Sequence, residues 1–153
     1  MKDARETGAA IGLFFELFNE IGIIEQLSRA AFEAQLPPGV LVSHFSILNH
    51  LIRVEDGRTP LDLARAFQVP KTTMTHTLAG LEKRGWVAMR PNPHDKRSKR
   101  VWLTDAGRSF RDEAIASLGS EIAKLMPHIP ERDVSAALPF LKSLRETLDR
   151  LRD

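Results

Sequence analysis

The 153-residue chain contains no cysteine. This absence excludes disulfide bonds, thiolate metal ligands, cysteine nucleophiles and cysteine-based redox sensors. The sequence also lacks an uninterrupted run of the roughly 18 to 20 apolar residues that span a bilayer. Its start lacks the basic residues, apolar stretch and cleavage site of a signal peptide. We therefore expect a cytoplasmic protein without a membrane partner.

Motifs that carry catalysis or bind metals are missing as well. The sequence has no Ser/His/Asp order, no glycine-rich phosphate loop and no paired acids that fit a pocket. No two histidines share a helical face at a spacing of four, and neither HExxH nor CxxC occurs. These histidines are His44, His50, His76, His94 and His128. We expect a non-enzymatic protein with no metal or other cofactor.

Charge is nearly balanced over the whole chain but unevenly distributed along it. The net charge is +2, yet residues 83–100 contain seven Lys or Arg and a single acid, Asp95. The rest of the chain carries 15 basic and 19 acidic residues and is mildly acidic. A concentrated cationic patch attracts polyanions by Coulomb steering and counterion release. The sequence therefore points to a polyanionic partner for this segment.

A long amphipathic helix is predicted over residues 4–34, where apolar residues repeat at intervals of three and four without an internal proline. It carries more apolar surface than a peripheral helix needs. Its apolar positions are Ile11, Phe14, Phe15, Phe18, Ile21, Ile24, Leu27 and Ala31. The Leu-Pro-Pro-Gly sequence at 36–39 then ends the helix.

Residues 43–85 have the pattern of a helix-turn-helix preceded by one further helix. Ser43 is the expected N-cap of a helix that reaches about residue 54, and Thr59-Pro60 begins a short helix over 61–67. A turn at 68–70 leads into a helix over 71–84, which Gly85 ends. Met74, Leu78 and Leu81 form its buried stripe. Two short helices joined by such a turn are typical of a helix-turn-helix.

After Gly85 the apolar period changes from that of a helix to that of a strand. Strands are predicted over 86–90 and 100–103, with the basic residues between them at the tip of a hairpin. Trp86 and Trp102 are expected to pack within the hairpin. Thr104-Asp105 caps a helix that runs to about residue 126. The last segment repeats apolar residues as a heptad, and Pro139 predicts a kink or a restart within it.

A helix-turn-helix followed by a basic hairpin is a winged helix, and these residues resemble the multiple-antibiotic-resistance regulator (MarR) family. The resemblance runs from about residue 45 to residue 107 and is strongest over LEKRGWVAMRPNPHDKRSKRVWLTDAG at 81–107. It implies a mainly α fold with a small β-hairpin. It also implies a dimerisation helix over 1–36, a winged-helix DNA-binding domain over 40–104 and dimerisation helices over 105–153.

The helix over 71–84 is the expected recognition helix in the major groove of double-stranded DNA. Its face opposite the buried stripe carries hydroxyl and nitrogen groups that bond to base edges or phosphates. Base-reading candidates are Lys71, Thr72, Thr75 and His76, and phosphate-binding candidates are Thr73 and Lys83. Pro70 and His76 depart from the family, which usually has a Ser or Thr cap and an Arg there, so the base preference is not transferred.

The hairpin is the expected wing, thin enough to follow the minor groove. By the family's pattern Arg97 is the side chain that inserts, and Asp95 orients Arg97. The phosphates would be lined by Arg90, Lys96, Lys99 and Arg100.

The apolar first and last helices require a partner surface, which predicts an isologous homodimer on a pseudopalindromic operator. The resemblance implies a repressor released by a small aromatic effector, with Phe18, His44 and Asn49 as candidate ligand residues, although action without a ligand stays open. The alternative function is a winged-helix protein-interaction module that has no DNA operator.

Overall fold

The computed structural model describes residues 4–152, with side chains described from residue 6. Two compact units are present, one ending at Ala116 and one beginning at Ser117. The predicted mainly α fold with one hairpin is confirmed. The elements are α1 (Ala4–Glu33), α2 (Val42–Arg53), α3 (Pro60–Phe67), α4 (Lys71–Lys83), β1 (Val87–Asn92), β2 (Asp95–Leu103), α5 (Asp105–Ser117), α6 (Gly119–Leu125) and α7 (Glu131–Leu151). The boundaries of the predicted DNA-binding and dimerisation domains stay a prediction.

The helix-turn-helix consists of α3 and α4, and its ends lie where the sequence predicts them. The Thr59 hydroxyl accepts a hydrogen bond from the Asp62 backbone N–H (3.1 Å), and Pro60 occupies the first helical position. Gln68 ends α3 with a φ of 52°, a left-handed conformation that the sequence did not predict. Gly85 follows α4 with a φ of 72°, which favours glycine just past a helix end.

The start of α2 differs from the prediction. The N-cap is Leu41, and Ser43 lies inside the first turn, so the prediction of Ser43 as the cap is wrong. The backbone N–H of Leu41 donates to Nδ1 of His44 (3.0 Å). A side chain at the third helical position that reaches back to the N-cap is one half of a capping box. An imidazole therefore replaces the expected hydroxyl.

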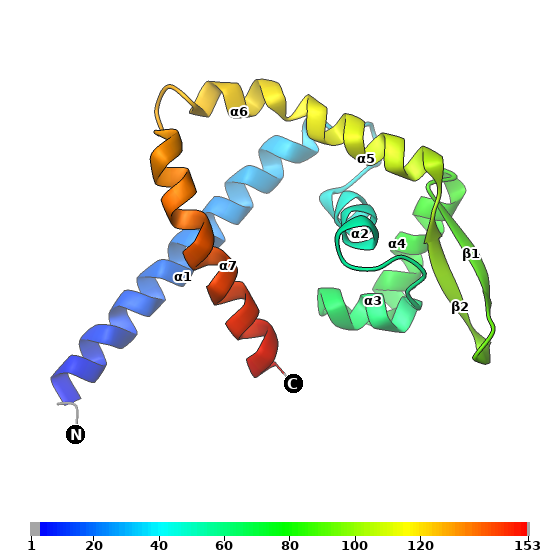
Figure 1. Cartoon of the computed structure of the whole chain (residues 1–153), viewed down its shortest axis with the longest axis horizontal. Coiled ribbons are helices and arrows are strands. Elements are labelled where there is room, and N and C mark those ends of the chain that lie inside the picture. Colours follow the sequence, from blue (N-terminus) through cyan, green and yellow to red (C-terminus); the bar gives the residue numbers. More distant parts are fainter. Residues whose placement is uncertain (1–3, 153) are drawn as a thin grey trace. The chain divides into compact units, whose positions relative to one another are not determined.

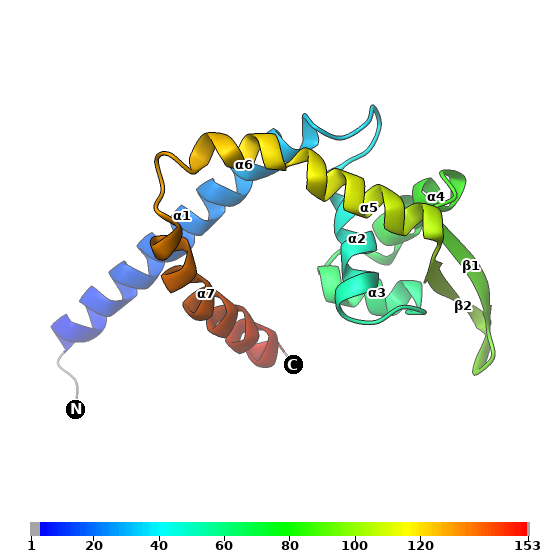
Figure 2. The ribbon, with the colours of Figure 1, turned by 45° about the horizontal axis from the view of Figure 1, so that its top comes forward.

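One apolar core joins α2, α3, α4 and the hairpin, which lie together in both ribbon views (Figures 1 and 2). Its buried residues are Ile47, Leu48, Leu51, Leu63, Ala64, Met74, Leu78, Leu81, Val87 and Val101. Because α4 and both strands contribute to the same close-packed core, the recognition helix and the wing are fixed relative to each other.

The strands of the hairpin are longer than predicted. The strand β2 begins at Asp95, and only Pro93 and His94 lie between the strands. Lys99 and Arg100 pair with Pro91 and Arg90, because backbone pairing does not require apolar alternation. Lys96 and Arg97 lie in an irregularity of the ladder, since the next pair is Asn92 with Asp95. A bridge between Arg58 and Val101 extends the ladder beyond β2. The wing is thus a two-stranded arm with an irregular far end.

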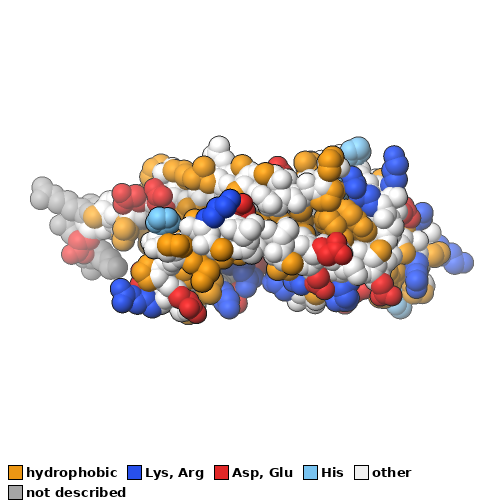
Figure 3. All heavy atoms as spheres, turned by 90° about the horizontal axis from the view of Figure 1, so that it is seen from above, with side chains coloured by type: hydrophobic (Ala, Val, Ile, Leu, Met, Phe, Trp, Pro, Cys, Tyr) orange, Lys and Arg blue, Asp and Glu red, His pale blue; other side chains and the backbone are white. Residues whose placement is uncertain are grey.

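The helix α1 belongs to the first unit, and most of its apolar side chains are exposed. Over Glu6–Glu33 it is long and apolar enough to cross a membrane by length and composition alone. The segment is not an uninterrupted apolar run, because it contains Glu16, Glu20 and Glu25. Charged residues near a bilayer centre cost roughly 2.5 to 3.5 kcal/mol each on insertion scales. Hydrophobic side chains are visible on the surface in the space-filling view (Figure 3).

The second unit contains α6 and α7. The predicted single helix from Asp105 to about Met126 is wrong, since α5 ends at Ser117 and α6 begins at Gly119, where glycine weakens helix propagation. The predicted restart at Pro139 is also wrong, because α7 runs through this proline. Pro139 removes one backbone donor from a helix of 21 residues, and the others hold the helix together.

Candidate nucleic-acid interface

The helix α4 has one buried face and one exposed polar face. Met74, Leu78 and Leu81 retain 2%, 2% and 0% of their accessible surface. The predicted DNA-contacting residues of α4 are all exposed and comprise Lys71, Thr72, Thr73, Thr75, His76 and Lys83. Pro70 is the N-cap and provides no side-chain cap, as expected. The first turn therefore keeps backbone N–H groups directed toward an anion.

The Thr75 hydroxyl is partly engaged within α4. Its Oγ1 donates to the carbonyl oxygen of Lys71 (2.9 Å), and Thr77 makes the same bond to Thr73 (3.0 Å). A threonine hydroxyl that donates in this way still has lone pairs to accept a hydrogen bond. As it stands, Thr75 presents an acceptor and a methyl group, which fit an adenine N6 donor or a thymine methyl group.

The wing presents its cations along β2 and the facing end of β1. Lys96, Arg97 and Lys99 are exposed, Arg100 is half-buried, and Arg90 lies directly opposite Arg100 in the ladder. Like charges directly opposite on antiparallel strands repel each other. The five cations lie on one hairpin, and such a cluster attracts a polyanion more strongly than an isolated charge does.

The predicted contact between Asp95 and Arg97 is present. The Arg97 backbone N–H donates to Asp95 Oδ1 (2.9 Å), and Arg97 Nε lies 3.7 Å from the same oxygen. The neighbouring Asn92 is buried, and its Oδ1 accepts from the His94 backbone N–H (3.1 Å). An Asn before a Pro is a sequence signal for such a turn, and here the Asn92 side chain bonds within it.

The base of the hairpin is tied to its surroundings by residues that the sequence analysis missed. Asp56 Oδ1 accepts hydrogen bonds from the backbone N–H groups of Gly57 and Leu103 (both 2.9 Å). Trp86 stacks on Phe110 of α5 with ring centroids 3.7 Å apart, in line with its predicted packing role. These contacts fix the hairpin at its base and leave the far end free to reach a groove.

The three predicted ligand residues have different surroundings. Phe18 lies on α1 with 42% of its surface exposed. Asn49 Oδ1 accepts from Arg111 Nε and Nη2 (3.1 and 2.8 Å), so its amide is engaged in a structural bond with α5. His44 lines a hollow that it shares with α4. A ligand site that includes these three residues stays a prediction.

The His44 imidazole lies in a positive environment. Burial, followed by the charges of Arg84 and His76, lowers the pKa of His44 below its ordinary value. Among the described residues no group of three or more His, Asp or Glu side chains could hold a metal ion. The chemistry available here is cationic and hydrogen-bonding, which suits an anion.

Comparison with known proteins identifies relatives of this chain. A model described as "MarR family" matches residues 39–98. The chain is 27% identical to the transcriptional activatory protein BadR of Rhodopseudomonas palustris, over 92% of this chain and 81% of BadR. It is 27% identical to the HTH-type transcriptional repressor YetL of Bacillus subtilis, over 94% and 85%. It is 28% identical to the multiple antibiotic resistance protein MarR of Escherichia coli, over 82% and 92%.

The solved structures agree with the sequence relatives. The crystal structure of wild-type Escherichia coli MarR in its apo form is 25% identical, with a TM-score of 0.72 over 84% of this chain and 96% of that chain. Together these matches support a MarR-family transcriptional regulator. A mutant of the same protein complexed with operator DNA shares the fold, with a TM-score of 0.68. The chain has a winged-helix fold, and its relatives support a DNA-binding transcriptional regulator.

Proposed function

We propose that this MarR-family protein is a cytoplasmic homodimeric repressor that binds a pseudopalindromic operator. The observation that carries the proposal is the two-sided character of α4. Its apolar stripe is buried in the core, while its polar face is exposed on the same compact unit as the cationic wing. A helix and a wing held in fixed register match the neighbouring major and minor grooves of one duplex.

Each predicted contact has a role in the proposed complex. The first turns of α4 read bases through Lys71, Thr72, Thr75 and His76, while Thr73 and Lys83 bind phosphates. The guanidinium of Arg97 enters the minor groove and Asp95 limits its orientation. The remaining cations of the wing, Arg90, Lys96, Lys99 and Arg100, follow the phosphates on both sides of the groove.

The proposed dimer accounts for apolar surface that each unit leaves uncovered. In α1 the exposed fractions are 65% for Ile11, 68% for Leu13 and 72% for Phe15. In α7, Leu141 and Leu148 of the predicted heptad seam are 40% and 48% exposed. Contiguous apolar surface of this kind marks an interaction site. A second copy would bury it in a two-fold interface, without placing the carboxylates of α1 in a bilayer.

We propose that a small effector binds in a hollow behind α4, and not at the predicted ligand residues Phe18, His44 and Asn49. A hollow of about 250 Å³ lies behind α4, between α2 and the turn of the helix-turn-helix. Apolar side chains of Ile47, Phe67, Val69 and Met74 line it together with hydroxyl groups and Arg29. Small-ligand sites have this composition. A ligand there would change DNA affinity by favouring one position of α4 over another.

A protein-interaction module is the competing function, and the exposed face of α4 distinguishes the two. Helices that dock into protein grooves present apolar anchors at spacings of three and four. The exposed face of α4 instead presents hydroxyl, imidazole and ammonium groups. DNA is therefore the better partner for this surface.

Selection from fragmented genomic DNA at physiological salt tests the proposal. Retained fragments are sequenced, and a duplex carrying the shared motif is compared with a scrambled duplex of equal length by fluorescence anisotropy. We expect the motif to bind at least roughly a thousandfold more tightly, as a complex of two chains per duplex by light scattering. Equal affinity for both duplexes, or a complex of one chain, would contradict the proposal.

A further inference from the structure

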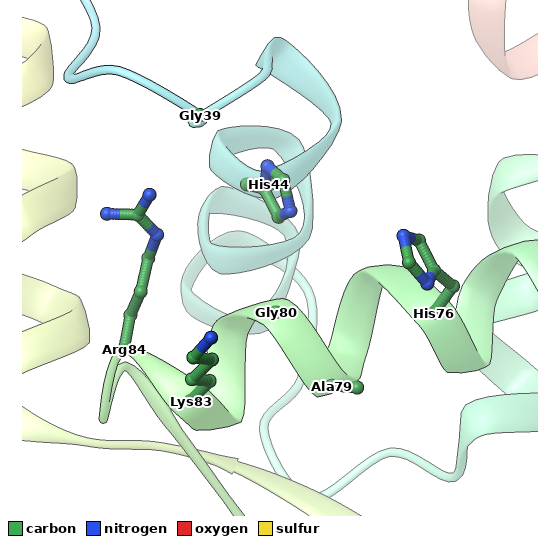
Figure 4. Close-up of a pocket in the computed structure, with 7 residues that line it drawn as sticks. All are labelled: Gly39, His44, His76, Ala79, Gly80, Lys83 and Arg84. Atoms are coloured by element: carbon green, nitrogen blue, oxygen red, sulfur yellow. The ribbon is translucent and has the colours of Figure 1, made fainter.

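A second hollow lies on the exposed side of α4 and is not accounted for by the predicted contacts. Its volume is about 560 Å³, and it lies between the α1–α2 connection, the start of α2 and the C-terminal half of α4. Figure 4 shows His76, Lys83 and Arg84 extending from α4 and the residue after it, on the side where His44 of α2 lies. Four nitrogen-bearing side chains thus surround one space.

The lining is cationic, and two glycines lie beside its imidazole and guanidinium groups. None of the described lining residues is acidic. A Cβ added at Gly80 would lie 3.2 Å from His44 Nε2, and one at Gly39 would lie 3.2 Å from Arg84 Nη2. Larger residues at these two positions would crowd the imidazole and the guanidinium. The glycines therefore give both groups room to meet an anion.

Two of the four groups are held in place by the fold. Nδ1 of His44 accepts the Leu41 N–H that starts α2, which directs the other ring nitrogen, Nε2, toward Gly80 and the hollow. Arg84 Nη2 donates to the Pro38 carbonyl oxygen (3.0 Å), and its guanidinium lies over the Trp86 ring. Groups that are already positioned lose little side-chain entropy on binding an anion.

The composition of the hollow favours a phosphate over an aromatic effector. Small-molecule sites are lined mainly by apolar and aromatic side chains with a few polar groups, whereas this lining consists of cations, imidazoles and small residues. Its His76 and Lys83 also belong to the exposed face of α4 that is proposed to enter the major groove. A strand bordering that groove would pass its backbone over the hollow.

We propose that this hollow binds one backbone phosphate of each operator half-site, which makes His44 and Arg84 additional DNA-contacting residues. The inference rests on the proposed function, because it requires α4 to lie in the major groove. The phosphate would receive hydrogen bonds from the two imidazoles and charge from Lys83 and Arg84. Such a contact positions the protein on the duplex without reading sequence.

A methylphosphonate scan of the selected operator locates this phosphate. Each backbone phosphate is replaced in turn by a neutral methylphosphonate, and affinity is measured for the wild type and for His44→Gln and His44→Glu. Gln and Glu at the third helical position can both reach back to the N-cap N–H, so α2 keeps its cap. His50→Gln is the matched control, since His50 is half-buried on the same helix and contacts Phe67.

We expect one position per half-site at which the wild type loses about tenfold or more and His44→Gln loses nothing further, in keeping with a hydrogen bond to a charged group. His44→Glu should bind less tightly than His44→Gln, and His50→Gln should follow the wild type. Identical scans for the wild type and His44→Gln would overturn the inference while leaving the proposed function intact. Failure of the wild type to prefer any duplex would instead refute the proposed function.

Inorganic phosphate distinguishes a DNA phosphate from a free anion in the hollow. Its binding is followed through the imidazole resonances of His44 in the DNA-free protein. Weak binding that a bound operator displaces agrees with a shared oxyanion site and supports the proposal. Binding of inorganic phosphate that persists with the operator bound would show that the hollow serves a free anion, and would overturn it.

Discussion

Replacing Arg97 with alanine isolates the contribution of the wing to DNA binding. The Arg97 side chain is 94% exposed, and its Nε lies 3.7 Å from Asp95 Oδ1. The bond that shapes the turn comes from the Arg97 backbone N–H, which alanine keeps. Exposed ion pairs contribute little to folding. We therefore expect an unchanged urea midpoint, so that any change in affinity reports on the bound state.

The expected loss of affinity follows from the number of contacts removed. A guanidinium in the minor groove contributes roughly 1 to 3 kcal/mol, which corresponds to about 5-fold to 150-fold in Kd. Each phosphate no longer neutralised lowers the slope of log K against log salt by roughly 0.9. Anisotropy titrations at several salt concentrations measure both quantities, and hydroxyl-radical footprinting should show lost protection where the minor groove faces the wing.

Arg132→Ala provides the control for a general effect of charge. Arg132 lies on α7, its side chain is 85% exposed, and it pairs with the adjacent Asp133 at 3.6 Å. The substitution therefore makes the same change in net charge at a similar ion pair outside the wing. Arg132→Ala should retain wild-type affinity. An Arg97→Ala variant with wild-type affinity, slope and footprint would refute the wing assignment, and so would an equal loss in both variants.

Three further predictions concern the packing at the base of the wing, the wing itself and His44 at the start of α2. Gly107→Ala should destabilise the fold by about 1 to 3 kcal/mol in urea denaturation, because the new Cβ would lie 2.1 Å from the Trp86 carbonyl oxygen; an unchanged midpoint would contradict this packing. Arg90→Thr should weaken operator binding yet leave the melting temperature equal or higher, since it removes a like charge opposite Arg100; a lower melting temperature would argue against the repulsion. Burial lowers the pKa of His44 in the folded protein below its ordinary value of 6.5. The unfolded chain therefore binds the proton more readily, so the stabilisation of the fold by neutral His44 should be full above pH 6.5 and should fall as the pH drops below it. His44→Gln should reduce that fall between pH 7 and 5, and superimposable pH profiles would refute the assignment.

Local signals in the sequence were sufficient to predict the helix-turn-helix. The cap at Thr59, the proline at position 60 and the glycine at position 85 each act within one helical turn, so their effects can be read without knowing the fold. The same holds for Thr104, whose Oγ1 accepts from the Gly107 backbone N–H (3.0 Å). These residues bound α3, α4 and the start of α5 close to the predicted positions.

The features that the sequence did not predict depend on residues far apart in the chain. Asn49 pairs with Arg111, 62 positions away, so nothing near Asn49 could show that its amide is engaged. Asp56 likewise bonds to Leu103, 47 positions away. Arg84 reaches Pro38 and closes the hollow beside α4. Such pairs follow from the tertiary fold, and periodicity alone cannot reveal them.

The wing combines features that cost stability in the free protein and fit a bound polyanion. Arg90 and Arg100 face each other across the ladder, and Arg100 Nε is buried without a hydrogen-bond partner in the described part of the chain. A buried donor left unpaired costs roughly 1 to 3 kcal/mol, and opposed like charges add to that cost. In the proposed complex, a phosphate bound near Arg90 and Arg100 would turn the repulsion between their charges into attraction to DNA. The arrangement that destabilises the free hairpin would thus favour the proposed bound state.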